Sequence, residues 1–381
     1  MKKLVIVLLL SIALIGLGSA QETQESNGAN WYTFFVNSVN DQFRFPLIGL
    51  VNSARGSHAM PQIGFINWNL NNFRTLQLAF VNIVGGNMTG AQIGFVNTTV
   101  DSFNGLQLGF VNTAKQLNGL QAGFINTVAG DRMGIQAGFV NTAAGGMMGI
   151  QTGFINTAAG DTMSIQAGFI NTAAGGMIGI QTGFINTAAG GTIGIQTGFV
   201  NTAKQLNGLQ FGFINYADST EKGIPVGFLS IVKNGGYKAI ELGVSELSPF
   251  TVSFKIGVER FYTSCTVGYN PFKDGIREQI IFGAGLGSII RLGKRCYFNP
   301  EITAHNRINE GFQRYISVIP YFGYTIIPNL SIVIGPSALW TYVNKEREKD
   351  AESPRYSILS YSINDENLLY LGARVALRFR W

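Results

Sequence analysis

The chain of 381 residues is poor in the side chains from which enzyme and metal sites are built. It has 2 His and 2 Cys, and charged residues make up 13% of it, against about 25% in typical soluble domains. His58 and His305 are separated from each other and from Cys265 and Cys296, so neither a zinc motif nor a Ser-His-Asp set is indicated. No glycine-rich stretch leads into a Lys-Ser or Lys-Thr pair as in a phosphate-binding loop. We therefore expect no enzymatic activity, no cofactor and no bound metal.

Long apolar runs are also missing after the first twenty residues, which have the three parts of a cleavable secretory signal. Two lysines precede an apolar run over residues 4–17, and residues 18–20 (Gly-Ser-Ala) form a small-residue cleavage site. That run is too short for a membrane helix, which needs about 20 residues, and no Cys follows it to carry a lipid anchor. If the exported chain meets a bilayer, it does so with strands. Export also leaves Cys265 and Cys296 free either to pair or to stay apart.

The middle of the chain is a repeat with a period of 15 residues. Gly-Phe-(Ile/Val)-Asn occurs ten times between Gly64 and Gly212, and the step falls to 14 only before Gly123 and Gly212. Each unit begins with an alternating stretch rich in β-branched and aromatic residues and ends in a glycine-rich turn, so it predicts one strand and one turn. The residues expected to form a structural ladder are Gln136, Gly138, Phe139, Asn141, Gln151, Gly153, Phe154, Asn156, Gln166, Gly168, Phe169 and Asn171.

Two architectures fit this repeat. In a β-solenoid each unit is one coil, Ile135, Ala137 and Phe139 point inward with Met147, and Asn141 starts a ladder of side-chain amides, unless it is only a turn former. In a large antiparallel barrel the same apolar residues face lipid, while Gln136, Gly138 and Thr142 face the lumen. The scarcity of charge between Met133 and Ala203 favours the barrel, but the equal turns favour a coil. We favour the solenoid.

Past residue 218 the repeat loosens and longer alternating strands follow. The last of them is apolar at Leu371, Ala373, Val375, Leu377, Phe379 and Trp381 and carries Gly372, Arg374, Arg378 and Arg380 on its other face. Its end, with Phe379 and Trp381, is similar to the C-terminal assembly signal of outer-membrane β-barrels. About eight such strands between Tyr237 and Trp381 predict a small antiparallel membrane barrel, which side chains would fill.

Residues 149–158, Gly-Ile-Gln-Thr-Gly-Phe-Ile-Asn-Thr-Ala, resemble the short "surface repeat" of envelope proteins from spirochaetes and related Gram-negative bacteria. The resemblance covers residues 47–230 and implies an exported or surface-exposed protein. The period is also similar to the β-roll repeats of trimeric adhesin heads, although their stalk is missing. Asp131 and Asp161 occupy the same turn of alternate units, and one acid per turn is too few for calcium, so we expect solvated turn residues.

The expected fold is all-β: a repeat β-solenoid followed by an antiparallel outer-membrane-type β-barrel, or alternatively one large antiparallel barrel. The predicted parts are a signal peptide (1–20), an N-terminal cap (21–46), the repeats (47–230) and the C-terminal barrel (231–381). We expect a non-enzymatic structural or adhesive protein of the outer membrane or cell surface, with lipid and an extracellular protein or matrix as partners. The alternative is an outer-membrane porin. The net charge of +6 is scattered, so no nucleic-acid partner is expected, and the oligomeric state stays open.

Overall fold

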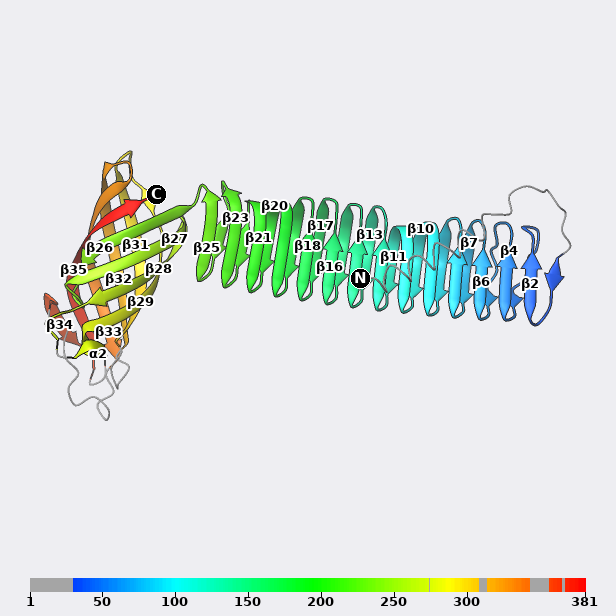
Figure 1. The fold of residues 1–381 in the computed structure, drawn as a ribbon, viewed down its shortest axis with the longest axis horizontal. Helices are drawn as coiled ribbons and strands as arrows, with labels where there is room; N and C mark the ends of the chain where they lie inside the picture. Colours follow the sequence, from blue (N-terminus) through cyan, green and yellow to red (C-terminus); the bar gives the residue numbers. More distant parts are fainter. Residues whose placement is uncertain (1–29, 274, 308–313, 343–355, 365–366) are drawn as a thin grey trace.

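A computed structural model describes residues 30–273, 275–307, 314–342, 356–364 and 367–381. About 71% of it is strand, arranged as a β-solenoid of about 13 coils and a closed barrel of eight antiparallel strands. Figure 1 shows the solenoid as a long row of coils that ends beside the barrel. The predicted fold class is confirmed, and the alternative of one large antiparallel barrel is wrong because the repeats pair in parallel. The predicted signal over residues 1–20 lies outside the described residues.

Each coil of the solenoid contributes two strand segments, which we call the Asn segment and the Gln segment after the motif residue that each carries in most coils; Leu47, Pro225 and Ser230 take that place in β3, β24 and β25. In three coils one continuous strand holds both segments: β10 (Val96–Leu108), β11 (Val111–Ala122) and β20 (Ile185–Thr197). The other Asn segments are β2 (Val36–Val39), β4 (Val51–Ala54), β6 (Ile66–Asn69), β8 (Val81–Val84), β12 (Ile125–Val128), β14 (Val140–Ala143), β16 (Ile155–Ala158), β18 (Ile170–Ala173), β21 (Val200–Leu206), β23 (Ile214–Thr220) and β25 (Leu229–Asn234). The other Gln segments are β3 (Leu47–Ile48), β5 (Gln62–Ile63), β7 (Phe73–Leu78), β9 (Met88–Ile93), β13 (Arg132–Ala137), β15 (Met147–Thr152), β17 (Thr162–Ala167), β19 (Met177–Thr182), β22 (Leu209–Phe211) and β24 (Ile224–Val226).

Equivalent residues of successive coils stand side by side. Asn141 pairs in parallel with Asn156 and Gln136 with Gln151, so the register repeats the sequence period. The two coils that are one residue shorter keep this register. Each lacks one residue between its Asn part and its Gln part, opposite residues 99–102 in one case and 188–191 in the other, so the pairs on both sides stay aligned. The period of the sequence is therefore the period of the hydrogen-bonded lattice.

The prediction of which side chains point inward is wrong for most of the strand. Ile135 and Phe139 are 40% and 44% exposed, whereas Gln136 and Asn141 are completely buried. Met147 does point inward, as predicted. Because side chains alternate across a strand, an inward Gln136 forces Ile135 to the surface. The outward Ile135 and Phe139 and the inward Gln136 match the facing predicted for the barrel alternative, but Thr142, predicted there to face inward, lies on the outer side of its strand.

The two ends of the solenoid are covered differently. At the N-terminal end β1 (Trp31–Tyr32) pairs antiparallel with β2 over two residues and so covers part of the outer edge of the first coil. The coils begin at Val36, inside the segment predicted as a cap, and continue to Asn234. At the other end β25 leads directly into the barrel and contacts its strand β27.

Eight strands close the barrel, and the first pairs with the last: β26 (Tyr237–Val244), β27 (Phe250–Val258), β28 (Phe261–Tyr269), β29 (Ile280–Gly287), β31 (Cys296–Arg307), β32 (Arg314–Ile327), β33 (Leu330–Tyr342) and β35 (Asn367–Arg380). Two short strands, β30 (Ile290–Arg291) and β34 (Leu359–Ser362), pair with β31 and β35. One helical turn, α2 (Ile276–Gln279), precedes β29. The exposed outward side chains of these strands are mostly apolar, as predicted, whereas the interior holds polar and charged side chains together with buried apolar ones such as Tyr262, Ile319 and Leu339.

Candidate functional site

The interior of the solenoid contains two columns of hydrogen-bonded amides. In the first, Asn141 Nδ2 donates to Asn156 Oδ1 at 2.8 Å, and Asn156 Nδ2 donates to Asn171 Oδ1 at 2.9 Å. In the second, Gln166 Nε2 donates to Gln151 Oε1 at 2.8 Å. The Asn column therefore donates toward the C-terminus and the Gln column toward the N-terminus. The predicted Asn ladder is confirmed, and the Gln ladder beside it runs with the opposite polarity.

Each Asn also ties its coil to the backbone of the next. Asn141 Nδ2 donates to Thr152 O at 2.9 Å, and Asn156 Nδ2 donates to Ala167 O at 3.0 Å. The buried amide thus has partners for both its donor hydrogens and its acceptor oxygen, which removes the desolvation penalty of an unpaired polar group. A turn former would not need these bonds, so the ladder explains the repeated Asn.

The motif glycine is needed because the coils approach closely beside the Asn column. A Cβ added at Gly153 would lie 1.8 Å from Gly138 O and 2.6 Å from Asn141 Nδ2. Gly149 has a different requirement, since its φ of 142° lies in a region that L side chains rarely adopt. The motif glycine is therefore required by packing, and Gly149 by its backbone conformation, although Ser164 takes the equivalent place in the next coil.

One edge of the solenoid is a continuous row of phenylalanine rings, which we call the Phe edge. Neighbouring ring centroids are 4.9–5.2 Å apart with interplanar angles of 0–8°. Each ring is 43–57% exposed. The Phe edge consists of Phe65, Phe80, Phe95, Phe110, Phe124, Phe139, Phe154, Phe169, Phe184, Phe199, Phe213 and Phe228. The predicted ladder members Phe139, Phe154 and Phe169 therefore stack outside the coils.

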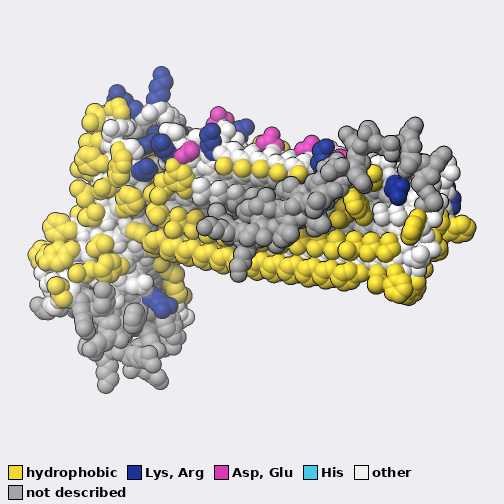
Figure 2. Space-filling view, turned by 45° about the vertical axis from the view of Figure 1, so that its right-hand side comes forward, with side chains coloured by type: hydrophobic (Ala, Val, Ile, Leu, Met, Phe, Trp, Pro, Cys, Tyr) yellow, Lys and Arg dark blue, Asp and Glu magenta, His cyan; other side chains and the backbone are white. Residues whose placement is uncertain are grey.

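The opposite edge, which we call the polar edge, is formed by the turns that follow the Asn segments. Its charged residues include Arg55, Asp101, Lys115, Asp131, Asp161, Lys204, Glu221 and Lys222. Asp161 Oδ1 accepts a hydrogen bond from Gly176 N at 2.7 Å, and Asp131 does the same for Gly146 at 2.9 Å. These aspartates are exposed turn residues, as predicted. Figure 2 shows the charged side chains gathered along one edge and rows of hydrophobic side chains along the face and the other edge.

The flat face between the two edges is apolar as well. Met133, Met148, Met163, Ile178 and Ile193 form an exposed column, each 48–55% exposed. This column and the turns of the polar edge border an open groove of about 1010 Å³. From the Phe edge across this flat face, the surface of the solenoid is therefore mostly uncharged, and charged side chains gather at the polar edge.

Arg132 is a charged side chain buried inside the solenoid. It lies between Leu117 and Met147 in an inward-facing column and is only 3% exposed. Its Nη2 donates to Ile150 O at 3.1 Å, while Nε and Nη1 have no hydrogen-bond partner. Burial lowers the pKa of Arg132 to about 10. A long apolar side chain would fit this column better.

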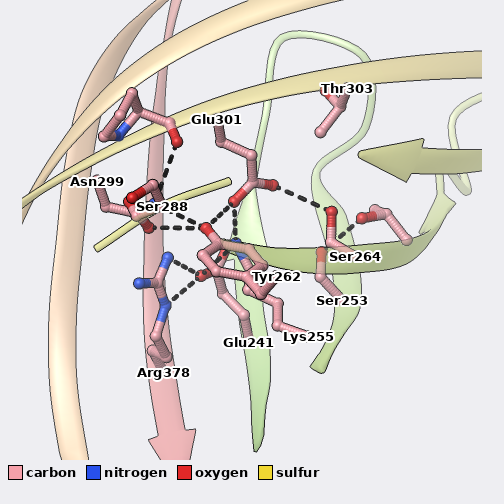
Figure 3. A network of polar contacts seen from close by, with 12 residues as sticks. Glu241, Ser253, Lys255, Tyr262, Ser264, Ser288, Asn299, Glu301, Thr303 and Arg378 are labelled. Carbon is pink, nitrogen blue, oxygen red and sulfur yellow. Dashed lines mark hydrogen bonds and ion pairs between the residues drawn. The ribbon is translucent and has the colours of Figure 1, made fainter. Parts of the chain in front are cut away.

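The barrel interior holds a network of buried charges (Figure 3). Lys255 is completely buried and lies between Glu241 and Glu301, and Arg378 Nε donates to Glu241 at 2.7 Å. Tyr262 donates to Glu301 at 2.6 Å. Two cations and two carboxylates balance one another, and the tyrosine occupies a remaining acceptor site. A second balanced pair, Arg374 with Glu246 at 2.8 Å, lies further along the barrel.

This interior leaves almost no free space. A cavity of about 20 Å³, bordered by Glu301, His305 and Arg374, has room for about one water molecule. The barrel is filled by side chains, as predicted, and its network links strands across the lumen. Sequence reasoning missed this network because its members are separated by up to 137 residues, as Glu241 and Arg378 are.

The histidines and cysteines do not form a site. His58 is buried between Phe43 and Phe73, where burial lowers its pKa, and His305 Nε2 bonds Thr303 Oγ1 at 2.8 Å. Cys265 and Cys296 are free and exposed. Within the described ranges no group of three or more His, Cys, Asp or Glu could hold a metal ion. No helix of that part of the chain is long and apolar enough to cross a membrane.

Comparisons with protein-family models, curated proteins and solved structures found no match to this chain.

Proposed function

We propose that this chain is a non-enzymatic outer-membrane protein in which the C-terminal barrel anchors the β-solenoid as a structural scaffold. The observation that carries the proposal is the outward apolar surface of the barrel. On β35, Leu371, Leu377 and Phe379 are 41–45% exposed, while Arg374 and Arg378 are buried among carboxylates. Neighbouring strands repeat this pattern, which is typical of a membrane barrel and unfavourable in water.

The lengths of the barrel's connections favour the periplasm as the side of the solenoid. The connections after β27 and β32 have two residues each, whereas β33 and β35 are separated by residues 343–366. Outer-membrane barrels place short turns in the periplasm and long loops outside. Because β25 enters β26 beside the short turn that follows β27, the solenoid belongs to the short-turn end. Adhesion to a host or matrix partner would require the opposite orientation.

Two measurements on cells test this proposal. The barrel is expected in the outer-membrane fraction, resistant to alkaline extraction, with slower migration on denaturing gels only after boiling. Proteinase added to intact cells is expected to spare the repeats until the outer membrane is opened. Recovery of the chain from the soluble fraction would refute the anchoring role, and loss of the repeats from intact cells would replace the internal scaffold by a surface adhesin.

A porin would need an open lumen, which the buried network does not leave. Reconstitution of the chain into planar bilayers is therefore expected to give no stepped conductance. Regular conductance steps that disappear on heat denaturation would contradict the filled barrel.

A further inference from the structure

We propose that the solenoid is embedded edgewise in the same bilayer as the barrel, with the Phe edge toward the membrane core and the polar edge at the membrane surface. This inference rests on the proposed membrane anchoring of the barrel. It identifies lipid as the partner of the repeats, so the solenoid lies along the membrane instead of projecting from it.

Two contacts along β28 and the turn before it set the depth of the last coils against the barrel. In the turn, Arg260 Nη1 donates to the carbonyl of Lys222 on the polar edge at 3.5 Å. Further along the barrel wall, Thr263 Oγ1 donates to the carbonyl of Phe228, the last ring of the Phe edge, at 3.2 Å. The polar edge is therefore level with the rim of the barrel, and the Phe edge is level with the body of its strands.

The Phe edge is continuous with the surface of the barrel that faces lipid. Phe228 borders a groove of about 440 Å³ together with Cys265, Leu286, Ile302 and Ile316. These four barrel side chains point outward and are exposed. An acyl chain against the outer wall of the barrel would thus also touch Phe228, the ring of the Phe edge that lies nearest the barrel.

The row itself has the character of a lipid-facing surface along its whole length. Twelve rings at intervals of about 5 Å give an apolar edge about 55 Å long without a charged residue. At the far end Trp31, Phe34 and Phe35 are 63–75% exposed. Soluble monomers rarely expose a contiguous apolar patch larger than a few hundred Å². The edge is therefore covered in the native protein.

Lipid explains the arrangement of the two edges better than a second copy of the chain does. A bilayer leaflet requires apolar side chains on one side and charged or polar groups at the interface, which is the division between the Phe edge and the polar edge (Figure 2). It also accommodates the exposed Met and Ile column on the flat face, which edge-to-edge packing of two solenoids would leave in water.

Depth-dependent fluorescence quenching tests the embedding. The full chain, with C265S and C296S, is folded into phosphatidylcholine vesicles and labelled at one new cysteine with an environment-sensitive dye. Phe154→Cys places the dye on the Phe edge far from the barrel, and Asp161→Cys is the matched position on the polar edge of the same coil. Leu371→Cys, on an outward position of β35, reports on the barrel. Far-UV circular dichroism confirms that each labelled chain is folded.

The expected result is strong quenching at positions 154 and 371 by doxyl groups on lipid tails, and quenching at position 161 by aqueous iodide. If iodide quenches position 154 while lipid quenches position 371, the barrel is anchored and the embedding is wrong. Protection of position 154 from both quenchers would also overturn it, in favour of a second copy on the Phe edge. If lipid does not reach position 371, the proposed membrane anchoring itself fails.

Discussion

Replacing Asn156 by Ala should open the solenoid locally, because this side chain bridges three coils. Asn156 accepts from Asn141 at 2.8 Å and donates to Asn171 at 2.9 Å and to Ala167 O at 3.0 Å. It is completely buried, so water does not replace the lost partners. The substitution removes three hydrogen bonds of about 1 kcal/mol each and leaves a buried donor and a buried acceptor unpaired.

The expected cost is about 3–5 kcal/mol, since each orphaned group adds about 1–3 kcal/mol while Ala167 O keeps its bond from Gly153 N and the Asn141 amide keeps a second acceptor. Asn141 still donates to Thr152 O. In a stack where each coil contacts only its neighbours, the loss should stay local and not unfold the barrel. Hydrogen exchange followed by mass spectrometry should therefore show faster exchange in peptides that cover residues 140–173, with little change in the barrel.

Thr157→Ala is the matched control, because Thr157 is next in the same strand and points outward. Its effect should stay within about 0.5 kcal/mol. If Asn156→Ala leaves exchange in residues 140–173 as slow as the control does, the amide ladder contributes nothing and the account of the repeated Asn is refuted.

Three other substitutions test further parts of the structure. Gly153→Ala should separate two coils and cost at least about 3 kcal/mol in the same exchange experiment, whereas Gly146→Ala, whose nearest contacts are at 3.4 Å, should be tolerated. Lys255→Met leaves Glu241 and Glu301 without their shared cation, so the barrel should lose about 3–5 kcal/mol and denature at lower temperature on gels, with part of the loss recovered by adding Glu301→Gln. Arg132→Met should stabilise its coils by about 1–3 kcal/mol, measured by hydrogen exchange. Because the folded pKa of Arg132 is about 10 and its ordinary value is 12.5, the wild type gains stability as pH rises above 10, so this advantage should shrink there.

The repeat of the sequence was enough to predict the lattice, but not which side of each strand faces inward. A 15-residue period with equal turns leaves few architectures, and the parallel pairing of Asn141 with Asn156 follows from it. The orientation was misjudged because apolar side chains were assumed to fill the interior, as in soluble proteins. The internal repeats contained a signal against this assumption. Gln stays the same from Gln62 to Gln210, whereas the Ile135 position also takes Leu and Ala.

The barrel was predictable for a different reason. Alternation of apolar and polar side chains along β35 identifies both its inner and its outer face, because successive side chains of a strand point to opposite sides of the barrel wall. Its internal partners were not predictable. The pairing of Lys255 with Glu241 and Glu301 depends on how far neighbouring strands are staggered around the barrel, and single strands do not contain that information.

The same reversal of inside and outside in both halves of the molecule argues for a single cause. In the solenoid the Asn and Gln amides are buried while the Phe edge and the Met and Ile column of the flat face are exposed, and in the barrel the ion pairs are buried while a band of aliphatic side chains faces outward. In water, each half alone would gain stability from the opposite arrangement, since apolar burial contributes about 25 cal/mol per Å². In an apolar solvent that gain disappears, and internal satisfaction of every polar group becomes the dominant requirement. Columns of Asn and Gln meet this requirement for a solenoid as paired charges meet it for a barrel. If lipid surrounds both the Phe edge and the barrel, one cause explains the exposed apolar side chains and the buried polar ones in both halves. A soluble solenoid attached to a membrane barrel would need a separate cause for the solenoid.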